Sequence, residues 1–406
     1  MKTLHKNLIE AVRLALNSTF FEGRYAEHVI EYIIKSNKKW GGRDRKFIAE
    51  TTYNIVRNWR LLHEINGTYQ NQNPSQLDRI ITIYFTMNSA QLPEWMSENF
   101  IEPNYLNSKL LQFKDNQKIR ESVPDWLDDL GVRELGSRWG ELLPCLNKQA
   151  DVVIRVNTLK TTKEDLIEFL KTENVEVEEI PAFAEALRLV KRTNLFMTEA
   201  YKKGLFEVQD ASSQLVAPSL NAEPGMRVID ACAGSGGKAL HLATLMQNKG
   251  RLLALDISNR KLGELGARAR RNGISIIEMR EIDSTKVIKR LEASADRLLL
   301  DVPCSGSGVL RRHPDTKWKL SPEVLNDIHG KQAELLQSYS RMLKPGGIMV
   351  YSTCSIFPTE NEVQIRKFLE LNDNFTLLSD QKIPPDQNGF DGFYIAKLYK
   401  NFDTEI

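Results

Sequence analysis

The sequence predicts an α/β protein whose carboxyl-terminal half is a mostly parallel, doubly wound sheet. From about residue 208, short apolar segments alternate with longer amphipathic segments. This order is expected of a parallel sheet with helices on both faces. A glycine-rich loop follows the first of these strands, and an acidic residue lies near the end of the second. In a doubly wound sheet, such strand ends form the ligand-binding edge.

The alternation allows each element of this half to be assigned. Strands are expected at 226–231, 252–257, 276–279, 297–302, 347–353, 375–378 and 393–400. Helices are expected between them, at 238–247, 259–273, 321–343 and 359–372, where apolar residues recur at helical spacing. Pro345-Gly346-Gly347 separates the third helix from the next strand, as breaker residues do.

The part of the chain before residue 208 has a different sequence pattern. The whole chain has 406 residues, more than a usual single domain. Apolar spacing predicts helices at 5–17, 24–37, 43–64, 76–88 and 124–139, with a loop at 100–108. A strand, a helix and two strands follow, at 152–158, 163–174, 175–180 and 186–190. We therefore expect three domains: an all-helical domain over 1–140, a small α+β subdomain over 141–207 and the large α/β domain over 208–406.

Composition limits the class of protein. Hydrophobic residues make up 41% of the chain, enough for packed cores, and no apolar run is long enough to cross a bilayer. The amphipathic amino terminus lacks the apolar core of a secretory signal. Four scattered cysteines, at 145, 232, 304 and 354, form no C-x-x-C pair, which disfavours a metal site or disulfides and favours reduced cytoplasm. We expect a cytoplasmic monomer without bound metal.

Basic residues cluster in two places, although the net charge is only +2. One cluster lies in the helical domain and contains Arg43, Arg45, Lys46 and Arg57. The other directly follows Cys304 and contains Arg311, Arg312, His313 and Lys317. A single basic cluster is most simply a solvated face. A cluster that directly follows Cys304 favours a phosphate-bearing substrate, and the residues of both clusters are candidates to bind it.

The glycine-rich loop is a candidate cofactor site. It comprises Cys232, Ala233, Gly234, Ser235, Gly236, Gly237 and Lys238, between a strand and a helix. Glycines there permit close backbone approach to a ligand at the amino end of the helix. Asp256, Asp283 and Asp301 follow or end successive strands, and would suit the ribose hydroxyls and adenine amino group of a nucleotide-like cofactor. The phosphate-binding pattern G-x-x-x-x-G-K-[ST] does not fit, but a nicotinamide-binding loop does.

Two cysteines point to covalent chemistry. Cys304 lies in Asp301-Val302-Pro303-Cys304-Ser305-Gly306, and Cys354 in Tyr351-Ser352-Thr353-Cys354-Ser355. Both follow apolar strands, so both thiols should reach the same edge of the sheet. One free cysteine is most simply a buried, inert thiol. Two in such matched settings favour nucleophilic catalysis, although the residues alone do not decide which thiol attacks.

Several motifs together resemble the S-adenosylmethionine-dependent RNA cytosine-5 methyltransferases, in particular the bacterial ribosomal RNA enzymes of the Sun/Fmu type. The matching segments are DACAGSGGK, LLLDVPCSGSGVLRRHPDTKW, VYSTCSIFPTENEVQI and DGFYIAKL, and Gln209-Asp210-Ala211-Ser212-Ser213 precedes them. Arg155-Val156-Asn157 resembles the small subdomain of that family. The amino-terminal helices resemble its NusB-like RNA-binding domain, and the carboxyl-terminal half its Rossmann-like class I methyltransferase domain.

The resemblance implies a cofactor, a substrate and a role for each site residue. The cofactor would be S-adenosylmethionine, and the substrate a cytosine in RNA, most often small-subunit ribosomal RNA. Cys354 would attack the base and Cys304 would assist release of the product. Asp301 would hydrogen-bond the cytosine ring, and Lys238 would lie close to the base. The chain departs from the family's A-P-G-G-K-T loop at Ser235 and Ala239, which leaves the detailed cofactor contacts open.

Other functions remain possible on the sequence. The same chemistry could act on transfer RNA, because the helical domain does not separate the two substrates. A nicotinamide-dependent oxidoreductase would fit the loop but leave both cysteine motifs without a purpose. A non-catalytic RNA-binding assembly factor would have no reason to retain Cys304, Cys354, Asp301 and Lys238 together.

Overall fold

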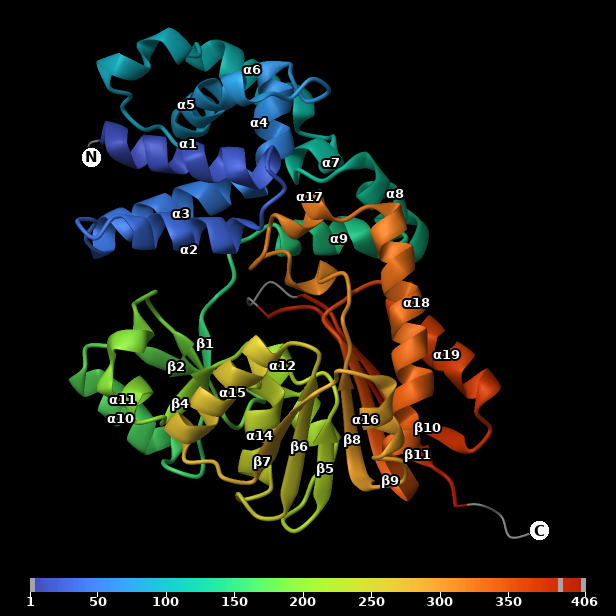
Figure 1. Cartoon of the computed structure of the whole chain (residues 1–406). Coiled ribbons are helices and arrows are strands. Elements are labelled where there is room, and N and C mark those ends of the chain that lie inside the picture. Colours follow the sequence, from blue (N-terminus) through green and yellow to red (C-terminus); the bar gives the residue numbers. More distant parts are fainter. Residues whose placement is uncertain (1–3, 386–389, 403–406) are drawn as a thin grey trace. The chain divides into compact units, whose positions relative to one another are not determined.

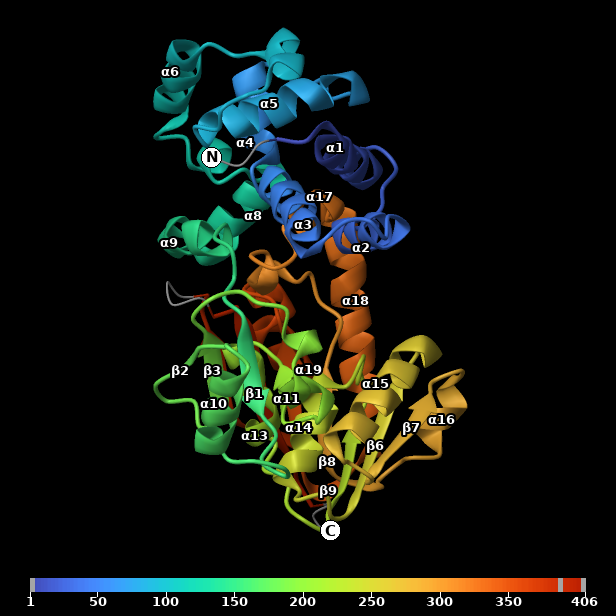
Figure 2. The ribbon, with the colours of Figure 1, turned by 90° about the vertical axis from the view of Figure 1, so that its left-hand side faces the viewer.

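The computed structural model describes residues 4–385 and 390–402 of the chain. It forms two compact units (Figures 1 and 2). The first comprises Met1–Lys148 and Leu310–Pro322, and the second comprises Gln149–Val309 and Glu323–Ile406. The helical unit thus extends past residue 140 to Lys148. It also includes Leu310–Pro322, a segment from within the predicted α/β domain that no local sequence pattern assigns to the helical unit.

The first unit is helical throughout its described part. Its helices are α1 (Lys6–Phe20), α2 (Ala26–Ser36), α3 (Gly42–Arg57), α4 (Trp59–Asn66), α5 (Leu77–Met87), α6 (Pro103–Phe113), α7 (Gln117–Arg120), α8 (Asp125–Leu135), α9 (Ser137–Leu146) and α17 (Thr316–Lys319), with short 3₁₀ turns η1 (Pro74–Gln76) and η2 (Glu94–Asn99). Leu16, Ile55, Trp59, Leu62 and Ile80 are among the buried side chains of its core. None of the described helices of either unit is long and apolar enough to cross a membrane.

Three details of the helical unit differ from the sequence prediction. The loop expected at 100–108 is mostly helix, because Pro103 occupies the first turn of α6, where its missing N–H costs nothing. The helix expected at 43–64 divides at Asn58 into α3 and α4. The helix expected at 124–139 divides at Gly136, whose φ of +58° ends α8.

The second unit begins with a small antiparallel sheet. Its strands are β1 (Val153–Val156), β2 (Val177–Glu179), β3 (Ala186–Leu189) and β4 (Phe206–Val208), in the order β2-β3-β1-β4. Helices α10 (Lys163–Thr172) and α11 (Glu199–Lys202) accompany it. The predicted strand-helix-strand-strand order is present. The short strand β4 lies at the expected domain boundary and was not predicted.

The large sheet of the second unit has the predicted doubly wound architecture. Its strands are β5 (Arg227–Asp230), β6 (Arg251–Asp256), β7 (Ile277–Glu281), β8 (Ala295–Asp301), β9 (Leu343–Thr353), β10 (Phe375–Ile383) and β11 (Phe393–Lys400), in the order β10-β11-β9-β8-β5-β6-β7. The pairs among β5, β6, β7, β8 and β9 are parallel, and β11 and β10 pair antiparallel at one end. The predicted fold class is confirmed.

Alternate residues of these strands face two helical layers, as the pleat requires. Val228, Leu252 and Val350 pack with α13 (Val216–Ser219), α14 (Gly237–Leu245) and α15 (Asn259–Asn272) on one face. Ile229, Leu253 and Tyr351 pack with α16 (Thr285–Lys289), α18 (Pro322–Tyr339) and α19 (Glu362–Leu371) on the other. Figure 1 shows α18 and α19 lying beside β9, β10 and β11. The apolar residues that predicted the strands thus form one core on each face.

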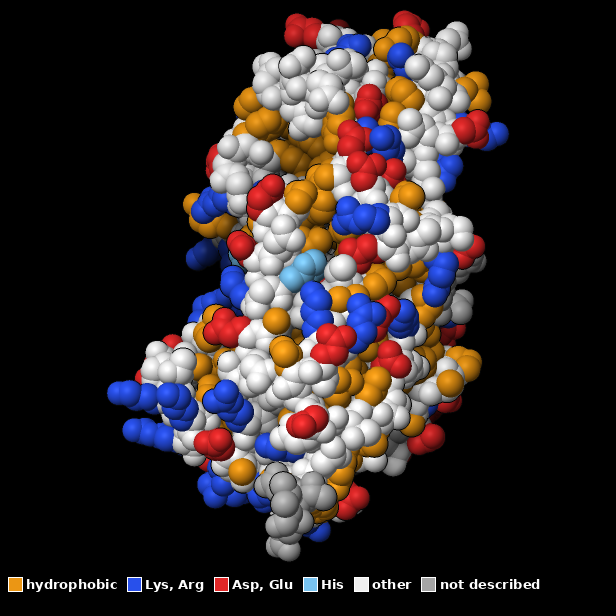
Figure 3. All heavy atoms as spheres, turned by 90° about the vertical axis from the view of Figure 1, so that its right-hand side faces the viewer, with side chains coloured by type: hydrophobic (Ala, Val, Ile, Leu, Met, Phe, Trp, Pro, Cys, Tyr) orange, Lys and Arg blue, Asp and Glu red, His pale blue; other side chains and the backbone are white. Residues whose placement is uncertain are grey.

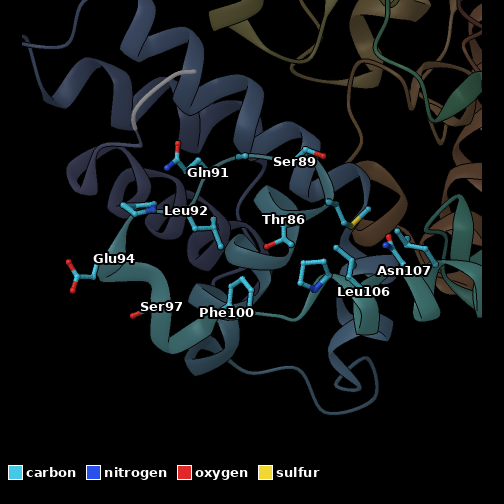
Figure 4. Close-up of a pocket in the computed structure, with 14 residues that line it drawn as sticks. Thr86, Ser89, Gln91, Leu92, Glu94, Ser97, Phe100, Leu106 and Asn107 are labelled. Carbon is cyan, nitrogen blue, oxygen red and sulfur yellow. The ribbon is translucent and has the colours of Figure 1, made fainter.

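The surface carries charges of both signs. Figure 3 shows basic and acidic side chains interspersed with apolar ones over the face it displays, in keeping with the net charge of +2. The helical unit also has a groove of about 660 Å³ between the end of α5, η2 and α6. Leu92, Phe100 and Leu106 are among its lining residues (Figure 4). None of the predicted site residues lines this groove.

Candidate active site

Four strands of the large sheet bring chemically active residues to one edge. Asp230, Asp256 and Asp301 are the last residues of β5, β6 and β8, and Cys354 directly follows the end of β9. These strands are parallel neighbours, with Asp301 in register with Ser352 of β9. Their carboxyl ends therefore lie together, where a doubly wound sheet binds its ligands.

The glycine-rich loop turns sharply into α14 as the sequence predicts. Gly234 and Gly236 have φ values of +55° and +91°, in the left-handed region that favours glycine. A Cβ atom at Gly236 would also lie 2.5 Å from the Leu265 side chain. The Gly234 N–H donates to Asp256 Oδ2 at 2.8 Å, which fixes the Asp256 carboxylate against the loop.

Beside this loop the second unit has a cavity of about 700 Å³. Its lining includes Cys232, Asp256, Ile257, Ile282 and Pro303. Ile257 is 76% exposed, so an apolar surface is open for a flat ring to pack against. Each Asp256 oxygen accepts one backbone hydrogen bond and retains a lone pair for a ligand hydroxyl. Apolar walls beside the Asp256 carboxylate, with charged side chains such as Glu292 and Lys331 also in the lining, suit a nucleoside.

The remaining acidic and thiol groups around the cavity differ in exposure. Asp283 is exposed and adjoins Ile282, one of the lining residues. Burial raises the pKa of the Cys232 thiol well above its ordinary value, and the Asp230 carboxylate adds to this shift. Cys232 therefore stays protonated and acts as a small wall residue, as expected for a structural thiol.

Asp230 carries a buried carboxylate that lacks a partner. Neither of its oxygens makes a hydrogen bond among the described residues, although the Cys232 N–H is near enough to lower its pKa. Burial, followed by the nearby Asp301, raises the pKa of Asp230 to about 7 against the lowering effect of Lys238. Since a buried carboxylate normally finds a partner, this position is prepared for a cationic or hydrogen-bond-donating ligand group.

Lys238 and Asp301 form a close ion pair. Lys238 Nζ lies 2.5 Å from Asp301 Oδ2, and the Ser352 hydroxyl donates to Asp301 Oδ1 at 2.8 Å. Burial lowers the pKa of Lys238, but the contact with Asp301 outweighs burial, so the pKa is raised above that of an ordinary lysine. Lys238 Nζ also lies 5.2 Å from the centre of the Phe393 ring. The pair thus presents a fixed cation and a fixed acceptor.

The two predicted thiols are in contact. Cys304 Sγ and Cys354 Sγ lie 3.2 Å apart, and both side chains are partly exposed. The hydrogen bond with Cys354, together with burial, raises the pKa of Cys304 well above its ordinary value. Cys304 is therefore a protonated thiol in this arrangement, which leaves Cys354 as the better candidate for a nucleophile.

Gly308 connects the loop that carries Cys304 to the loop that carries Cys354. The Gly308 N–H donates to the Cys354 carbonyl at 2.9 Å, and the Gly308 carbonyl accepts from Gly392 N–H at 2.8 Å. A Cβ atom at Gly308 would lie 2.2 Å from the Gly392 carbonyl oxygen, so no side chain fits. The sequence analysis did not single out Gly308. Its place in Ser305-Gly306-Ser307-Gly308 was the available signal.

A buried carboxylate was also missed. Glu360 is fully buried and accepts hydrogen bonds from Ser305 and Ser355, the residues that follow the two cysteines. Sequence position gave little indication of this, because Glu360 falls in the first turn of the helix expected at 359–372, where an acidic residue is ordinary.

The small subdomain supports the cofactor loop. Arg155 of β1 is buried and donates to the Gly237 carbonyl at 3.0 Å and to the side chain of Gln209. Arg268 of α15 donates to the Ser235 carbonyl at 2.8 Å. These contacts fix the carbonyl groups of Ser235 and Gly237 and so hold the backbone of the loop in place. Arg155-Val156-Asn157 had been noted in the sequence, but without this role.

Comparison with known proteins identifies the family. The family described as "16S rRNA methyltransferase RsmB/F" matches residues 217–399, and the associated ferredoxin-like domain matches residues 123–195. The "probable ribosomal RNA small subunit methyltransferase B" of Synechocystis is 31% identical, over 88% of this chain and 91% of that protein. The chain belongs to the RsmB/F family.

Further relatives agree with this assignment. The ribosomal RNA small subunit methyltransferase B of Enterobacter is 32% identical over 72% of this chain and 69% of that protein. The crystal structure of PH0851 is 25% identical and superposes with a TM-score of 0.83, over 98% of this chain and all of that chain. This RsmB/F-family chain is therefore a methyltransferase, and its cofactor is S-adenosylmethionine.

The basic residues predicted to bind RNA fall into two groups. In the RsmB/F-family chain, Arg43, Arg45 and Lys46 lie exposed on α3. Lys38 and Lys39, just before α3, are also exposed and were not predicted. Arg312 and His313 are partly exposed, and His313 lies 3.8 Å from the exposed carboxylate of Glu27.

Arg57, Arg311 and Lys317 require a correction. Each is buried within the helical unit, with at most 7% of its surface exposed. Arg57 donates to the carbonyls of Lys148 and Arg311, and Arg311 donates to the carbonyl of Cys145. Because these guanidinium and ammonium groups serve internal carbonyls, they cannot reach a phosphate without local unfolding. We withdraw them from the predicted RNA-contact set.

Proposed function

We propose that the chain methylates carbon 5 of a cytosine in small-subunit ribosomal RNA through a covalent bond to Cys354. The single observation that carries this proposal is the pair of thiols 3.2 Å apart at the sheet edge that also holds Lys238 and Asp301. The names of the relatives support ribosomal RNA as the substrate.

The chemistry explains why a thiol is needed. Carbon 5 of cytosine is a poor nucleophile. Addition of the Cys354 thiolate to carbon 6 turns the ring into an enamine and makes carbon 5 reactive. When bound, S-adenosylmethionine supplies the electrophilic methyl group. A base then removes the proton from carbon 5, and the electron pair of that C–H bond re-forms the ring double bond as the Cys354 thiolate leaves.

The other site residues have matching roles. Cys304, held against Cys354, assists release of the methylated base. Asp301 accepts a hydrogen bond from the cytosine ring and steadies the adduct. Lys238 keeps its proton beside Asp301, and it supplies positive charge next to the base where negative charge develops.

The residues present also fit the cofactor. The unpartnered Asp230 carboxylate would face the positive charge of its methionine part. The backbone of the loop that contains Ala233, Gly234, Ser235, Gly236 and Gly237 would approach the cofactor closely, and Asp256 would accept from the ribose. Ile257, with Asp283 near the adenine amino group, would bound the adenine end of the cavity.

The substrate RNA would be held by exposed basic side chains of the helical unit. Arg43, Arg45 and Lys46 would neutralise phosphates, and Arg312 and His313 would extend this contact. The target base must be unpaired or flipped from its stack to reach the thiols.

The test combines mapping with trapping. The protein is incubated with labelled S-adenosylmethionine and RNA depleted of 5-methylcytosine, and the labelled nucleotide is mapped. We expect a single cytosine in small-subunit ribosomal RNA; label in transfer RNA would reassign the substrate. RNA carrying 5-fluorocytosine should form a stable adduct, and mass spectrometry should place it on Cys354.

Two cysteine variants separate the roles. Cys354→Ala should abolish both methylation and adduct formation. Cys304→Ala should accumulate the enzyme–RNA adduct, because its release is slowed. Full methylation by Cys354→Ala would overturn the covalent scheme, and an adduct on Cys304 in the parent protein would reverse the two assignments.

A further inference from the structure

We infer that Glu360 is a positioning residue that fixes the two reactive thiols relative to each other. The inference rests on the proposed function, because it concerns the thiols of the same reaction. Glu360 lies in the short 3₁₀ turn η6 (Pro358–Glu360) that follows the Cys354 loop, and its side chain is completely buried.

One side of this contact is the loop that carries Cys304. Ser305 directly follows Cys304, and it donates to Glu360 twice. Its backbone N–H lies 2.7 Å from Oε2 and its hydroxyl 2.5 Å from Oε1. Gln332 of α18 donates from the same side chain nitrogen to Glu360 Oε2 at 3.2 Å and to the Pro303 carbonyl at 3.0 Å. The carboxylate thus holds the backbone on both sides of Cys304.

The other side is the loop that carries Cys354. Ser355 directly follows Cys354, and its hydroxyl donates to Glu360 Oε1 at 2.6 Å. Oε1 therefore accepts from one serine of each cysteine loop. The Tyr351 hydroxyl donates to the Glu360 carbonyl at 2.7 Å, which fixes the backbone of Glu360 to β9. A single carboxylate connects both loops to one strand.

The hydrogen bonds of Glu360 are made among buried side chains. Every donor around Glu360 is buried, so removal of the carboxylate leaves the Ser305 N–H without this acceptor and breaks the direct contact with both serine hydroxyls. The Gly308 N–H would still hold the Cys354 carbonyl, and the two serine hydroxyls lie 3.4 Å apart, so the loops would stay connected but shift relative to each other. Ser307 and Ser355 share a further hydrogen bond at 2.9 Å, but that contact does not reach the backbone beside Cys304. Glu360 is the described side chain that bonds directly to both residues that follow the cysteines.

The network also predicts how substitutions should rank. Glutamine keeps the length of the side chain, with one oxygen for Ser305 N–H and an amide that can donate to the two serine hydroxyls. Both hydroxyls already act as acceptors, from Ser307 N–H and Phe357 N–H, and the Ser305 hydroxyl has a second lone pair for the amide. The Ser355 hydroxyl can accept from the amide when it turns to donate to Ser307, a contact in which either hydroxyl can be the donor. Aspartate is one methylene too short to reach both loops, and alanine reaches neither.

The first experiment measures the rate constant of adduct formation on 5-fluorocytosine RNA in a single turnover. Glu360→Ala should slow this step about 100-fold, the order expected when a reacting group is misplaced by about 1 Å. The dissociation constants for RNA and for S-adenosylhomocysteine should not change. Glu360→Gln should react near the parent rate, and Glu360→Asp should resemble Glu360→Ala. Each rate is corrected for the folded fraction measured by circular dichroism.

The second experiment measures the spacing of the thiols without RNA. In a Cys145→Ala, Cys232→Ala background, a short bifunctional thiol reagent should link Cys304 to Cys354. The linked yield should fall in Glu360→Ala and recover in Glu360→Gln. An unchanged yield and adduct rate in folded Glu360→Ala would overturn the inference. Crosslinking that depends on Glu360 in a parent protein that forms no RNA adduct would instead leave the inference standing and overturn the proposed function.

Two serine variants test the loops one at a time. Ser355→Ala frees the Cys354 loop and should slow adduct formation. Ser305→Ala frees the Cys304 loop and should leave formation intact but slow release, so that adduct accumulates. Ser108→Ala is the matched control, because its exposed hydroxyl donates within α6 to the Tyr105 carbonyl. If all three variants behave alike, Glu360 does not act through the two loops.

Discussion

Lys238 and Lys317, one in each unit, are both largely buried but have different roles. Lys238 in the second unit is 12% exposed and contacts the Asp301 carboxylate at 2.5 Å. Lys317 in the helical unit is 2% exposed, and its nearest acceptors are the neutral oxygens of Arg57, Glu121 and Asn147. Lys238 donates to a charged acceptor, whereas Lys317 donates to three neutral ones, so only Lys238 is in contact with a counter-charge.

This difference decides the charge that each lysine carries. Asp301 raises the pKa of Lys238 above its ordinary value despite burial. Burial, reinforced by the Arg57 guanidinium, lowers the pKa of Lys317 well below its ordinary value, against a smaller raising effect of Glu121. Lys238 is thus a permanent cation at a reactive edge. Lys317 is a structural donor that closes the segment Leu310–Pro322 onto its own unit.

The largest expected effect separates the two lysines by activity. Lys238→Met removes the cation beside Asp301 and the target base, and should lower kcat by about 100- to 1,000-fold, as loss of one charge-stabilising group does. Lys317→Met is the matched substitution, and should leave kcat per folded molecule unchanged. Single-turnover methylation with saturating RNA and cofactor measures both.

The measured kcat values could also contradict the contrast between Lys238 and Lys317. An equal loss of kcat in both variants, after correction for the folded fraction, would show that Lys238 acts only through folding. In that case the pairing with Asp301 would have no catalytic meaning.

The second prediction concerns stability and its pH dependence. All six tryptophans of the chain lie in the helical unit, so their fluorescence reports its unfolding alone. Lys317→Met removes three hydrogen bonds and should lower the free energy of unfolding at pH 9 by about 1 to 3 kcal/mol. Denaturant titrations at pH 7 and pH 9 measure this value.

The sign of the pH dependence follows from the lowered pKa. Between the folded and unfolded pKa values of Lys317, the unfolded chain binds the extra proton, so stability rises with pH toward the ordinary lysine value. Stability is lost as the pH falls through the folded pKa. The parent should therefore gain more stability than Lys317→Met between pH 7 and pH 9. Parallel pH dependences would show that Lys317 keeps its proton when folded.

The positions of the candidate site residues at the sheet edge could be predicted because topology determines where they lie. Parallel strands deliver their carboxyl ends to one edge, so a residue that follows a buried strand is placed by the sheet itself. Asp256, Asp301 and Cys354 are of this kind, and Asp230, which was not predicted as a site residue, has the same position at the end of its strand. The strand pattern also predicted the two faces of the large sheet, since alternate residues must point to opposite sides.

The sequence pattern could not separate exposed basic residues from buried ones. Arg43 and Arg311 lie in equally basic stretches of sequence, yet one is exposed and the other is buried. Burial of Arg311 depends on a contact with the Cys145 carbonyl, far away in the sequence. Glu360 was missed for the same reason, because its partners lie on another loop. The local sequence pattern does not indicate such contacts between residues far apart in the chain.

The smallest expected effect tests this separation directly. Arg43→Ala removes one exposed cation and should flatten the plot of log affinity against log salt by about 0.7 to 0.9, the share of one phosphate contact. Arg311→Ala should leave that slope unchanged, because its charge serves an internal carbonyl, and should instead destabilise the helical unit as judged by tryptophan fluorescence. RNA-binding isotherms at several salt concentrations measure the slopes. Equal flattening in both variants would mean that Arg311 reaches the RNA after all, because a group held inside the unit cannot release a counterion from the phosphate backbone.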